Sequence, residues 1–139
     1  MAEEKKIPRG IRNNNPLNIR IGCKWKYEKP VNTDGVFEQF TQMRYGCRAA
    51  FLLLKRYIQT YHRNNVKEII SRWAPSNENN TELYIKRVCL YMKILPTTSI
   101  RFEDKDTMYS LFQAMAMVEC GQKIDIDVVM RGYYMALNS

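Results

Sequence analysis

The sequence lacks a long hydrophobic run, since no stretch of its 139 residues approaches the ~20 apolar residues that span a bilayer. We therefore expect no membrane span. Histidine occurs once, as His62, and the four cysteines at 23, 47, 89 and 120 lack the paired short spacings of a zinc site. We expect free thiols, no metal site and no cofactor.

The opening residues MAEEKKIPRG carry charges but no apolar segment follows them, so they do not have the pattern of a secretory signal. We therefore expect synthesis in the cytoplasm without a signal peptide. The formal net charge of +8 favours an anionic partner: nucleic acid, a membrane surface or a bacterial wall. Charge alone does not choose among these partners, because it also serves solubility.

The chain has the length and the apolar content, 45%, of one ordinary domain. We expect a flexible segment at 1–8 and a single domain at 9–139. Prolines and glycines interrupt the first forty residues. Short apolar–polar alternation at 19–25 and 35–40 nevertheless predicts brief strands, with a hairpin across 28–35.

Helical periodicity begins near residue 43 and predicts five helices, at 43–62, 66–73, 82–92, 107–119 and 128–138. The expected N-caps are Asn65, Asn80 or Thr81, Asp104 or Asp106, and Asp125 or Asp127, and Gly121 is the expected C-cap. The predicted fold class is mainly α (α+β), with about five helices and a small N-terminal β element.

Glu119 occupies an unusual position in the fourth predicted helix. It lies four residues beyond Met115 and seven beyond Phe112, so its carboxylate falls on the apolar stripe. It also lies at the helix C-terminus, where the macrodipole disfavours negative charge. Both effects raise a carboxyl pKa, as glycosidic cleavage requires of an acid. The alternative is a rim position paired with Lys123 or Arg131.

The segment RGIRNNNPLNIR at 9–20 gathers four carboxamides: Asn13, Asn14, Asn15 and Asn18. Neutral amides can donate to and accept from the hydroxyl and N-acetyl groups of a glycan. Loop asparagines more often satisfy backbone groups through Asx-turns. Both roles stay open, and Asn15 and Asn18 are the residues for which a structural role is expected.

In order along the chain, RGIRNNNPLNIR, DGVFEQF, YGCRAA, RWAPSNENNTELYIKRV and a glutamate–glycine helix end resemble a phage-associated family in the lysozyme-like superfamily. Its members include virion structural proteins and peptidoglycan-degrading domains. The family pattern is R-G-I-R-N-N-N-P-G-N-I, F-x-x-F, G-x-R-A, W-A-P-x-x-E-N-x-T-x-x-Y and E-N-G. The resemblance runs from about Arg9 to Leu137. The first motif and the W-A-P motif are specific, whereas the E-N-G end is not.

The resemblance assigns residues position by position. Leu17 replaces the glycine of N-P-G-N, and Cys120 replaces the asparagine of E-N-G. These two departures fit either a changed substrate or a weakened enzyme. The matched positions are Asn13, Asn14, Asn15, Pro16, Asn18 and Ile19; Phe37 and Phe40; Gly46, Arg48 and Ala49; Trp73, Ala74, Pro75, Glu78, Asn79, Thr81 and Tyr84; and Glu119 and Gly121.

The resemblance implies a lysozyme-like domain that cleaves peptidoglycan glycan strands as a lytic transglycosylase or muramidase-type glycosidase, with Glu119 as catalytic acid/base. A circularly permuted arrangement would bring the first loop to the glutamate helix, an analogy at the level of fold. The predicted substrate-binding residues are Asn13, Asn14, Asn15, Asn18, Trp73, Glu78, Asn79, Thr81 and Tyr84. Hydrolysis needs a second carboxylate, for which Asp34, Glu38 and Glu78 are candidates.

Each of these assignments has a plainer interpretation. A tryptophan at a helix end, such as Trp73, more often belongs to the core, and Glu78 fits a solvated loop. Tyr133 and Tyr134 fit either the core or a cleft wall. Because a lytic transglycosylase can work with one catalytic acid/base and only Glu119 stands out, transglycosylation is slightly favoured over hydrolysis.

The expected partners are peptidoglycan and, second, other virion proteins, and the expected protein is a monomer. It would be made in the host-cell cytoplasm and act at the wall after release or as part of a virion. The alternative is an inactive virion structural or interaction protein of the same fold. Nucleic-acid binding is less favoured, because the basic residues are dispersed along the sequence.

Overall fold

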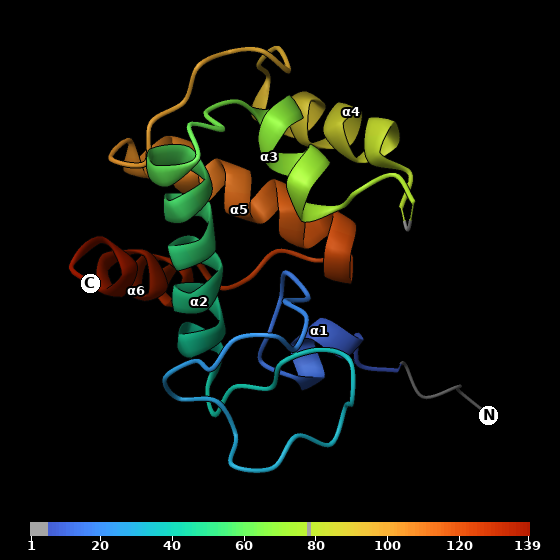
Figure 1. Ribbon diagram of the computed structural model, residues 1–139, viewed down its shortest axis with the longest axis vertical. Coiled ribbons are helices and arrows are strands. Elements are labelled where there is room, and N and C mark those ends of the chain that lie inside the picture. The colour runs from blue at the N-terminus through green and yellow to red at the C-terminus, as the bar shows by residue number, and fades with distance from the viewer. Residues whose placement is uncertain (1–5, 78) are drawn as a thin grey trace.

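The structure is a computed structural model that describes residues 6–77 and 79–139. Residues 1–5 of the predicted flexible segment, and the predicted site residue Glu78, lie outside the described residues. The fold is mainly helical (Figure 1). The described elements, in chain order, are α1 (Arg9–Arg12), α2 (Met43–Lys55), the π-helical η1 (Arg56–Thr60), α3 (Val66–Trp73), α4 (Thr81–Met92), α5 (Lys105–Cys120) and α6 (Ile126–Leu137).

The five helices predicted from periodicity are confirmed, and the first of them continues from α2 into η1. The side chains of Asn65, Asn80 and Asp125 accept hydrogen bonds from backbone N–H groups and so cap α3, α4 and α6. Asp104 stands at the start of α5 without a side-chain capping bond. Gly121 ends α5 in the left-handed region, with φ 72°.

The predicted N-terminal strands are wrong. The two segments share one isolated antiparallel bridge, Arg20 with Phe37, and a second bridge joins Glu28 to Phe40. No longer strand forms in the described part of the chain. Side chains supply much of the loop's hydrogen bonding instead. Asn32 accepts from the backbone N–H groups of residues 34 and 35, and Asp34 from those of residues 36 and 37. The first segment also holds a helical turn, α1, that periodicity did not predict.

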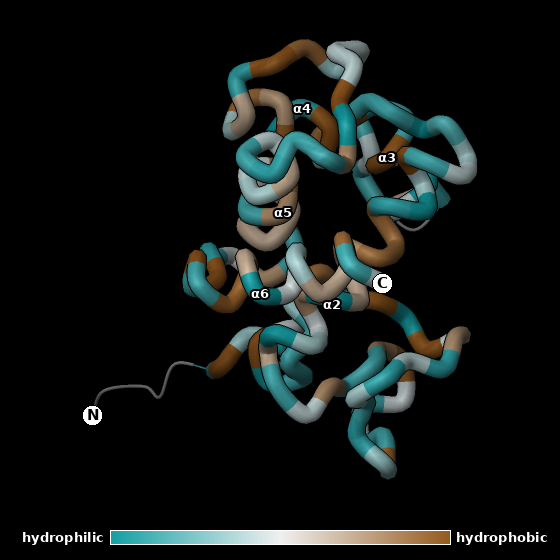
Figure 2. Tube along the Cα trace, turned by 90° about the vertical axis from the view of Figure 1, so that its left-hand side faces the viewer, coloured by the Kyte–Doolittle hydropathy of each residue, from teal (hydrophilic) through white to brown (hydrophobic). Residues whose placement is uncertain are grey.

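Helix α5 is the central element of the fold. Nine of its sixteen residues are buried, and it contacts α1, α4 and α6. In Figure 1 it lies between α3 and α4 on one side and the N-terminal loop on the other. Hydrophobic and hydrophilic residues are mixed along the helices, as Figure 2 shows. The apolar residues of α2, α3, α4, α5 and α6 contribute to one shared core.

Two glycines bring neighbouring segments together. A Cβ at Gly132 of α6 would lie 2.5 Å from the Cβ of Cys47 in α2, so these helices pack at very close range. A Cβ at Gly46 would lie 1.8 Å from the carbonyl oxygen of Asn14. The asparagine loop therefore rests directly on the N-terminal half of α2, which fixes its position beside the end of α5.

Among the described residues, no helix is both long enough and apolar enough to cross a bilayer. The lysozyme-like assignment of the fold, and its circular permutation, remain predictions.

Candidate functional site

Glu119 lies near the C-terminal end of α5, one residue before its last residue, Cys120. The left-handed turn at Gly121 closes the helix directly behind it. The side chain leaves the apolar stripe of α5 at the point where the asparagine loop approaches. The carboxylate is therefore partly buried between two segments that are 101 residues apart in sequence.

Two neutral donors hold the Glu119 carboxylate. The Asn18 amide donates to Oε1 at 3.0 Å and to the Glu119 backbone carbonyl at 3.2 Å. The Tyr84 hydroxyl donates to Oε2 at 2.9 Å. Each carboxylate oxygen thus has one fixed partner, which sets the rotamer of the side chain. The alternative pairing with Lys123 or Arg131 is absent from the described ion pairs.

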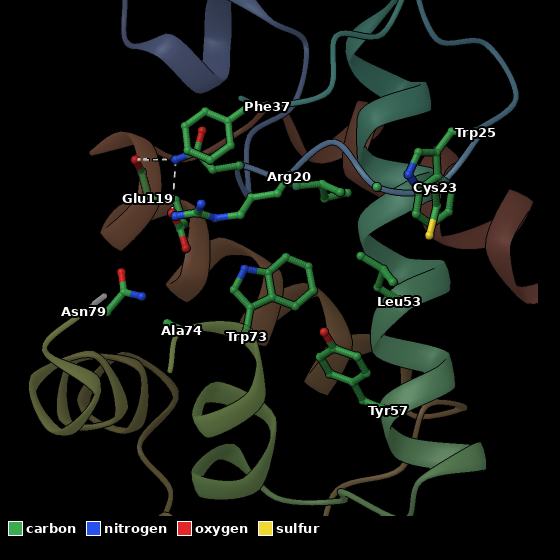
Figure 3. A pocket seen from close by; sticks show the side chains of 13 residues that line it. Arg20, Cys23, Trp25, Phe37, Leu53, Tyr57, Trp73, Ala74, Asn79 and Glu119 are labelled. Atoms are coloured by element: carbon green, nitrogen blue, oxygen red, sulfur yellow. Dashed lines mark hydrogen bonds between the residues drawn. The ribbon is translucent and has the colours of Figure 1, made fainter. Parts of the chain in front are cut away.

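The pKa of Glu119 is raised, and burial is the largest cause. The hydrogen bonds from Asn18 and Tyr84, the nearby Trp73 indole N–H and the positive charge of Arg20 act in the opposite direction. The Arg20 guanidinium points toward the carboxylate (Figure 3). In turn, burial and the charge of Glu119 raise the pKa of the Tyr84 phenol, so this hydroxyl stays protonated.

A cavity of about 290 Å³ opens beside Glu119. This volume is near the lower end of the range for small-ligand sites. Aromatic side chains and one arginine line the cavity, with Arg20 beside the carboxylate and Trp25 and Tyr57 at the far end, next to α2 (Figure 3). This lining suits a ligand with both apolar and hydrogen-bonding faces. The lining residues are Asn18, Ile19, Arg20, Gly22, Cys23, Trp25, Phe37, Leu53, Tyr57, Trp73, Ala74, Asn79 and Glu119.

Of the four predicted asparagines in the 13–18 loop, only Asn18 lines this cavity. Asn13 donates to Asp34 and accepts from Gln39, and Asn14 donates to the carbonyl of residue 40. Asn15 is fully buried, donates to the carbonyls of residues 19 and 38, and accepts from the N–H of residue 19. These three amides support the loop that presents Asn18.

The W-A-P segment also contains both residues that line the cavity and residues that support the local structure. Trp73 and Asn79 line the cavity, and the Trp73 indole donates to the Leu17 carbonyl at 3.3 Å. Thr81 donates to the Ala74 carbonyl, which closes the turn before α4. Tyr84 lies beneath the cavity and reaches it through Glu119.

The two departures from the family pattern lie outside the cavity lining. Leu17 is fully buried in the core, and its φ is not positive, so its backbone does not require the glycine of the pattern. Cys120 is buried and its thiol donates to the Gln122 carbonyl at 3.8 Å. Neither substitution alters a group that faces the cavity.

The other candidate carboxylates are held elsewhere. Asp34 forms a bidentate ion pair with Arg9, both contacts being 2.7 Å, and this partner holds the pKa of Asp34 well below its usual range. Glu38 is buried in a neighbouring hollow together with Glu28. Burial and proton sharing with Glu28 raise the pKa of Glu38 to about 7. Within the described lining, Glu119 is the only carboxylate.

Four prominent lining residues were not predicted from the sequence to bind substrate: Arg20, Trp25, Phe37 and Tyr57. Phe37 belonged to the F-x-x-F motif, which gave no indication of a ligand. The arginine beside a carboxylate is recognisable only once the loop is folded against α5. The groups of histidine, cysteine, aspartate and glutamate that would suggest a metal site do not occur among residues 6–77 and 79–139.

Comparison with known proteins connects the chain to a virus. Over 84 residues it is 43% identical to Protein P5 of Pseudoalteromonas phage PM2, a match covering 58% of this chain and 52% of that protein. The chain is related to a bacteriophage protein. It spans about half the length of this relative. It matches no protein-family model, so the lysozyme-like resemblance remains a prediction.

Proposed function

We propose that this phage-related protein cleaves the glycan strands of peptidoglycan, with Glu119 as general acid and then general base. The observation that carries the proposal is the environment of the Glu119 carboxyl group. This group is partly buried, has a raised pKa, accepts hydrogen bonds from two neutral donors and faces a cavity. A carboxyl group in such a place can protonate the leaving oxygen of a glycosidic bond.

The cavity suits a sugar in other respects. Trp73, Trp25 and Tyr57 provide ring faces for the apolar faces of a pyranose. The Asn79 amide and the Arg20 guanidinium provide polar contacts at the rim. In this proposal Asn18 and Tyr84 position the acid, while Asn79 and Trp73 contact the glycan.

The number of carboxylates decides between two chemistries. Hydrolysis with two carboxylates places them roughly 5 to 10 Å apart across the bond. Asp34 is held by Arg9, and Glu38 lies outside the cavity lining. With one acid, Glu119 gives its proton to the leaving oxygen and then takes one from the attacking hydroxyl of the same sugar. The product is an anhydro-sugar, and the activity is that of a lytic transglycosylase.

The test is digestion of purified peptidoglycan by the wild type and by Glu119→Gln, with released fragments identified by mass spectrometry. We expect anhydro-muropeptides from the wild type and at least a ~1000-fold lower rate from the variant, since the proton donor is lost. Glu82→Gln, a change of an exposed carboxylate in α4, is the matched control and should keep the full rate.

Each other outcome changes the proposal in a defined way. Fragments with reducing ends would replace transglycosylation by hydrolysis and require a second carboxylate. Equal release by the wild type and Glu119→Gln would remove Glu119 from catalysis. No release from several wall types by a folded wild type would favour the inactive virion protein.

A further inference from the structure

A second hollow lies at the N-terminal end of α2, where α6 and the loop residue Tyr27 complete its lining. Its volume is about 660 Å³, and it shares no lining residue with that cavity. Leu53 of α2 and Tyr57 of η1 line the first cavity, whereas Arg44 and Tyr45 of α2 line the second. The proposed glycan cleavage uses none of the groups in this second hollow.

Tyrosines form the aromatic part of the hollow. Tyr27, from the loop, stacks on Tyr45 with ring centroids 4.0 Å apart and an interplanar angle of 16°. Tyr27 is 48% exposed and Tyr134, from α6, is 42% exposed. Tyr27 adopts φ 67°, a left-handed conformation that is unfavourable for a large side chain, and its carbonyl accepts two hydrogen bonds from Thr41. The fold therefore holds this ring in place at a backbone cost.

Arginines surround the tyrosines. The Arg44 guanidinium lies 5.0 Å from the centroid of the Tyr45 ring, and that of Arg48 lies 5.9 Å from the centroid of Tyr27. Arg131 of α6 lines the opposite wall. In the part of the chain that the structure describes, none of these three guanidiniums lies within 4.0 Å of a carboxylate oxygen. Asp127 is the one acidic residue in the lining, so the hollow keeps an excess of positive charge.

We propose that this hollow binds single-stranded nucleic acid. Planar guanidinium groups suit phosphate oxygens, and tyrosine ring faces stack on unpaired bases. A duplex does not fit this chemistry, because its bases are already stacked and paired. A neutral glycan offers no negative charge to the two lining arginines or to the nearby Arg48. The basic residues are dispersed along the sequence, but the fold collects Arg44, Arg48 and Arg131 around one aromatic group.

The test is fluorescence anisotropy of a labelled twelve-nucleotide oligodeoxythymidine with the full chain at several salt concentrations. Tyr134→Ala should weaken binding about five- to hundredfold, the range for loss of one base–aromatic stack. Arg131→Gln should weaken binding and lower the slope of log affinity against log salt by about 0.7. Arg131 is exposed, so this second variant tests the site even where Tyr134→Ala disturbs the fold.

Control substitutions outside the hollow distinguish binding at this site from non-specific attraction to the positive charge of the protein. Tyr91→Ala and Arg87→Gln alter an exposed tyrosine and an exposed arginine of α4, and both should bind within twofold of the wild type. Glu119→Gln should also bind as the wild type does, which separates this proposal from glycan cleavage. An abasic strand of equal length should bind several-fold more weakly.

Three results would overturn the proposal. The first is wild-type binding no tighter than about 100 µM at 50 mM salt, the weak limit of non-specific association. The second is equal binding of the abasic strand. The third is an equal loss of affinity in the α4 variants.

Discussion

Four asparagines within six residues have different partners, and the difference explains how a loop can position an acid. Asn13, Asn14 and Asn15 bind backbone and side-chain groups of the loop itself. Asn18 alone donates to Glu119. Asn18 adopts φ 54°, a left-handed conformation that asparagine tolerates better than most residues. Three of the four amides therefore stabilise the loop itself, and one positions the candidate acid.

The protonation of Glu119 depends on opposing contributions. Burial raises its pKa, while donors from Asn18 and Tyr84 stabilise the charged form and lower it. A balance of this kind keeps the group able both to give and to accept a proton. Removing one donor should therefore move the balance without removing the acid.

Tyr84→Phe tests this balance at the level of one hydroxyl. Loss of the 2.9 Å hydrogen bond to Oε2 should raise the Glu119 pKa further, because the carboxylate loses a donor. The pH profile of muropeptide release should move toward higher pH, and release at alkaline pH should fall off later than in the wild type, because Glu119 must start protonated and would stay protonated to a higher pH. Release rates from pH 4 to 9 provide the measurement. Tyr91→Phe, an exposed tyrosine, should leave the profile unmoved, and an unmoved profile in Tyr84→Phe would contradict the role of its hydroxyl.

Sequence reasoning could find Glu119 but could not find its partners. The position of Glu119 on the stripe of α5 follows from helical spacing within one segment. Tyr84 had a place in a motif, yet its contact with Glu119 depends on the register of α4 against α5, which periodicity does not determine. The contribution of Arg20 likewise depends on a loop that only folding brings to the end of α5.

At the scale of elements, local signals predicted the helices and failed for the strands. Asn65 and Asp125 cap their helices through bonds that span only two or three residues, so the sequence nearby contains the information. The loop alternates apolar and polar residues as a strand would. Its backbone is instead bonded by Asn32 and Asp34, and these side-chain bonds leave only two bridges.

The contact of α2 with α6 makes a prediction about packing. Gly132→Ala would place a Cβ 2.5 Å from that of Cys47 and 2.9 Å from the backbone nitrogen of Arg48. Neither of these atoms can move without shifting α2, so we expect the free energy of unfolding to fall by about 1 to 3 kcal/mol. Chemical denaturation would measure the loss. Gly22→Ala is the control, since a Cβ there meets nothing within 4 Å, and equal losses in both variants would contradict this account of the helix contact.

At the scale of the whole molecule, the net charge of +8 indicates a function only once the positions of the basic residues in the fold are known. Arg20 belongs to the cavity beside Glu119, while Arg44 and Arg131 belong to the second hollow at the N-terminal end of α2. The two hollows share no lining residue, so changes in one leave the chemistry of the other intact. The two proposals can therefore fail separately.

The pH dependence of stability is a property of the whole molecule to which three carboxyl groups contribute with different signs. Asp34 has a lowered pKa, so its stabilisation is complete above the unfolded value near 4 and is lost as the pH falls below it. Glu38 and Glu119 have raised pKa values, so the folded state holds their protons longer than the unfolded chain does. Their contribution is complete at acidic pH and is lost as the pH rises, up to about 7 for Glu38.

Stability should consequently be greatest near pH 5 and lower at pH 8, unlike that of a protein whose carboxyl groups are all ion-paired. Glu38→Gln removes one of the two ionisations responsible. Between pH 5 and pH 8 the free energy of unfolding should decrease in both proteins. We expect the decrease to be smaller in the variant by roughly 1 to 3 kcal/mol. Urea denaturation at several pH values would measure this difference, with Glu103→Gln, an exposed carboxylate, as the control. If the free energy of unfolding depends on pH in the same way in the wild type and in Glu38→Gln, the pKa of Glu38 is not raised in the folded protein. That result would contradict the effect of burial and of Glu28 on this carboxyl group.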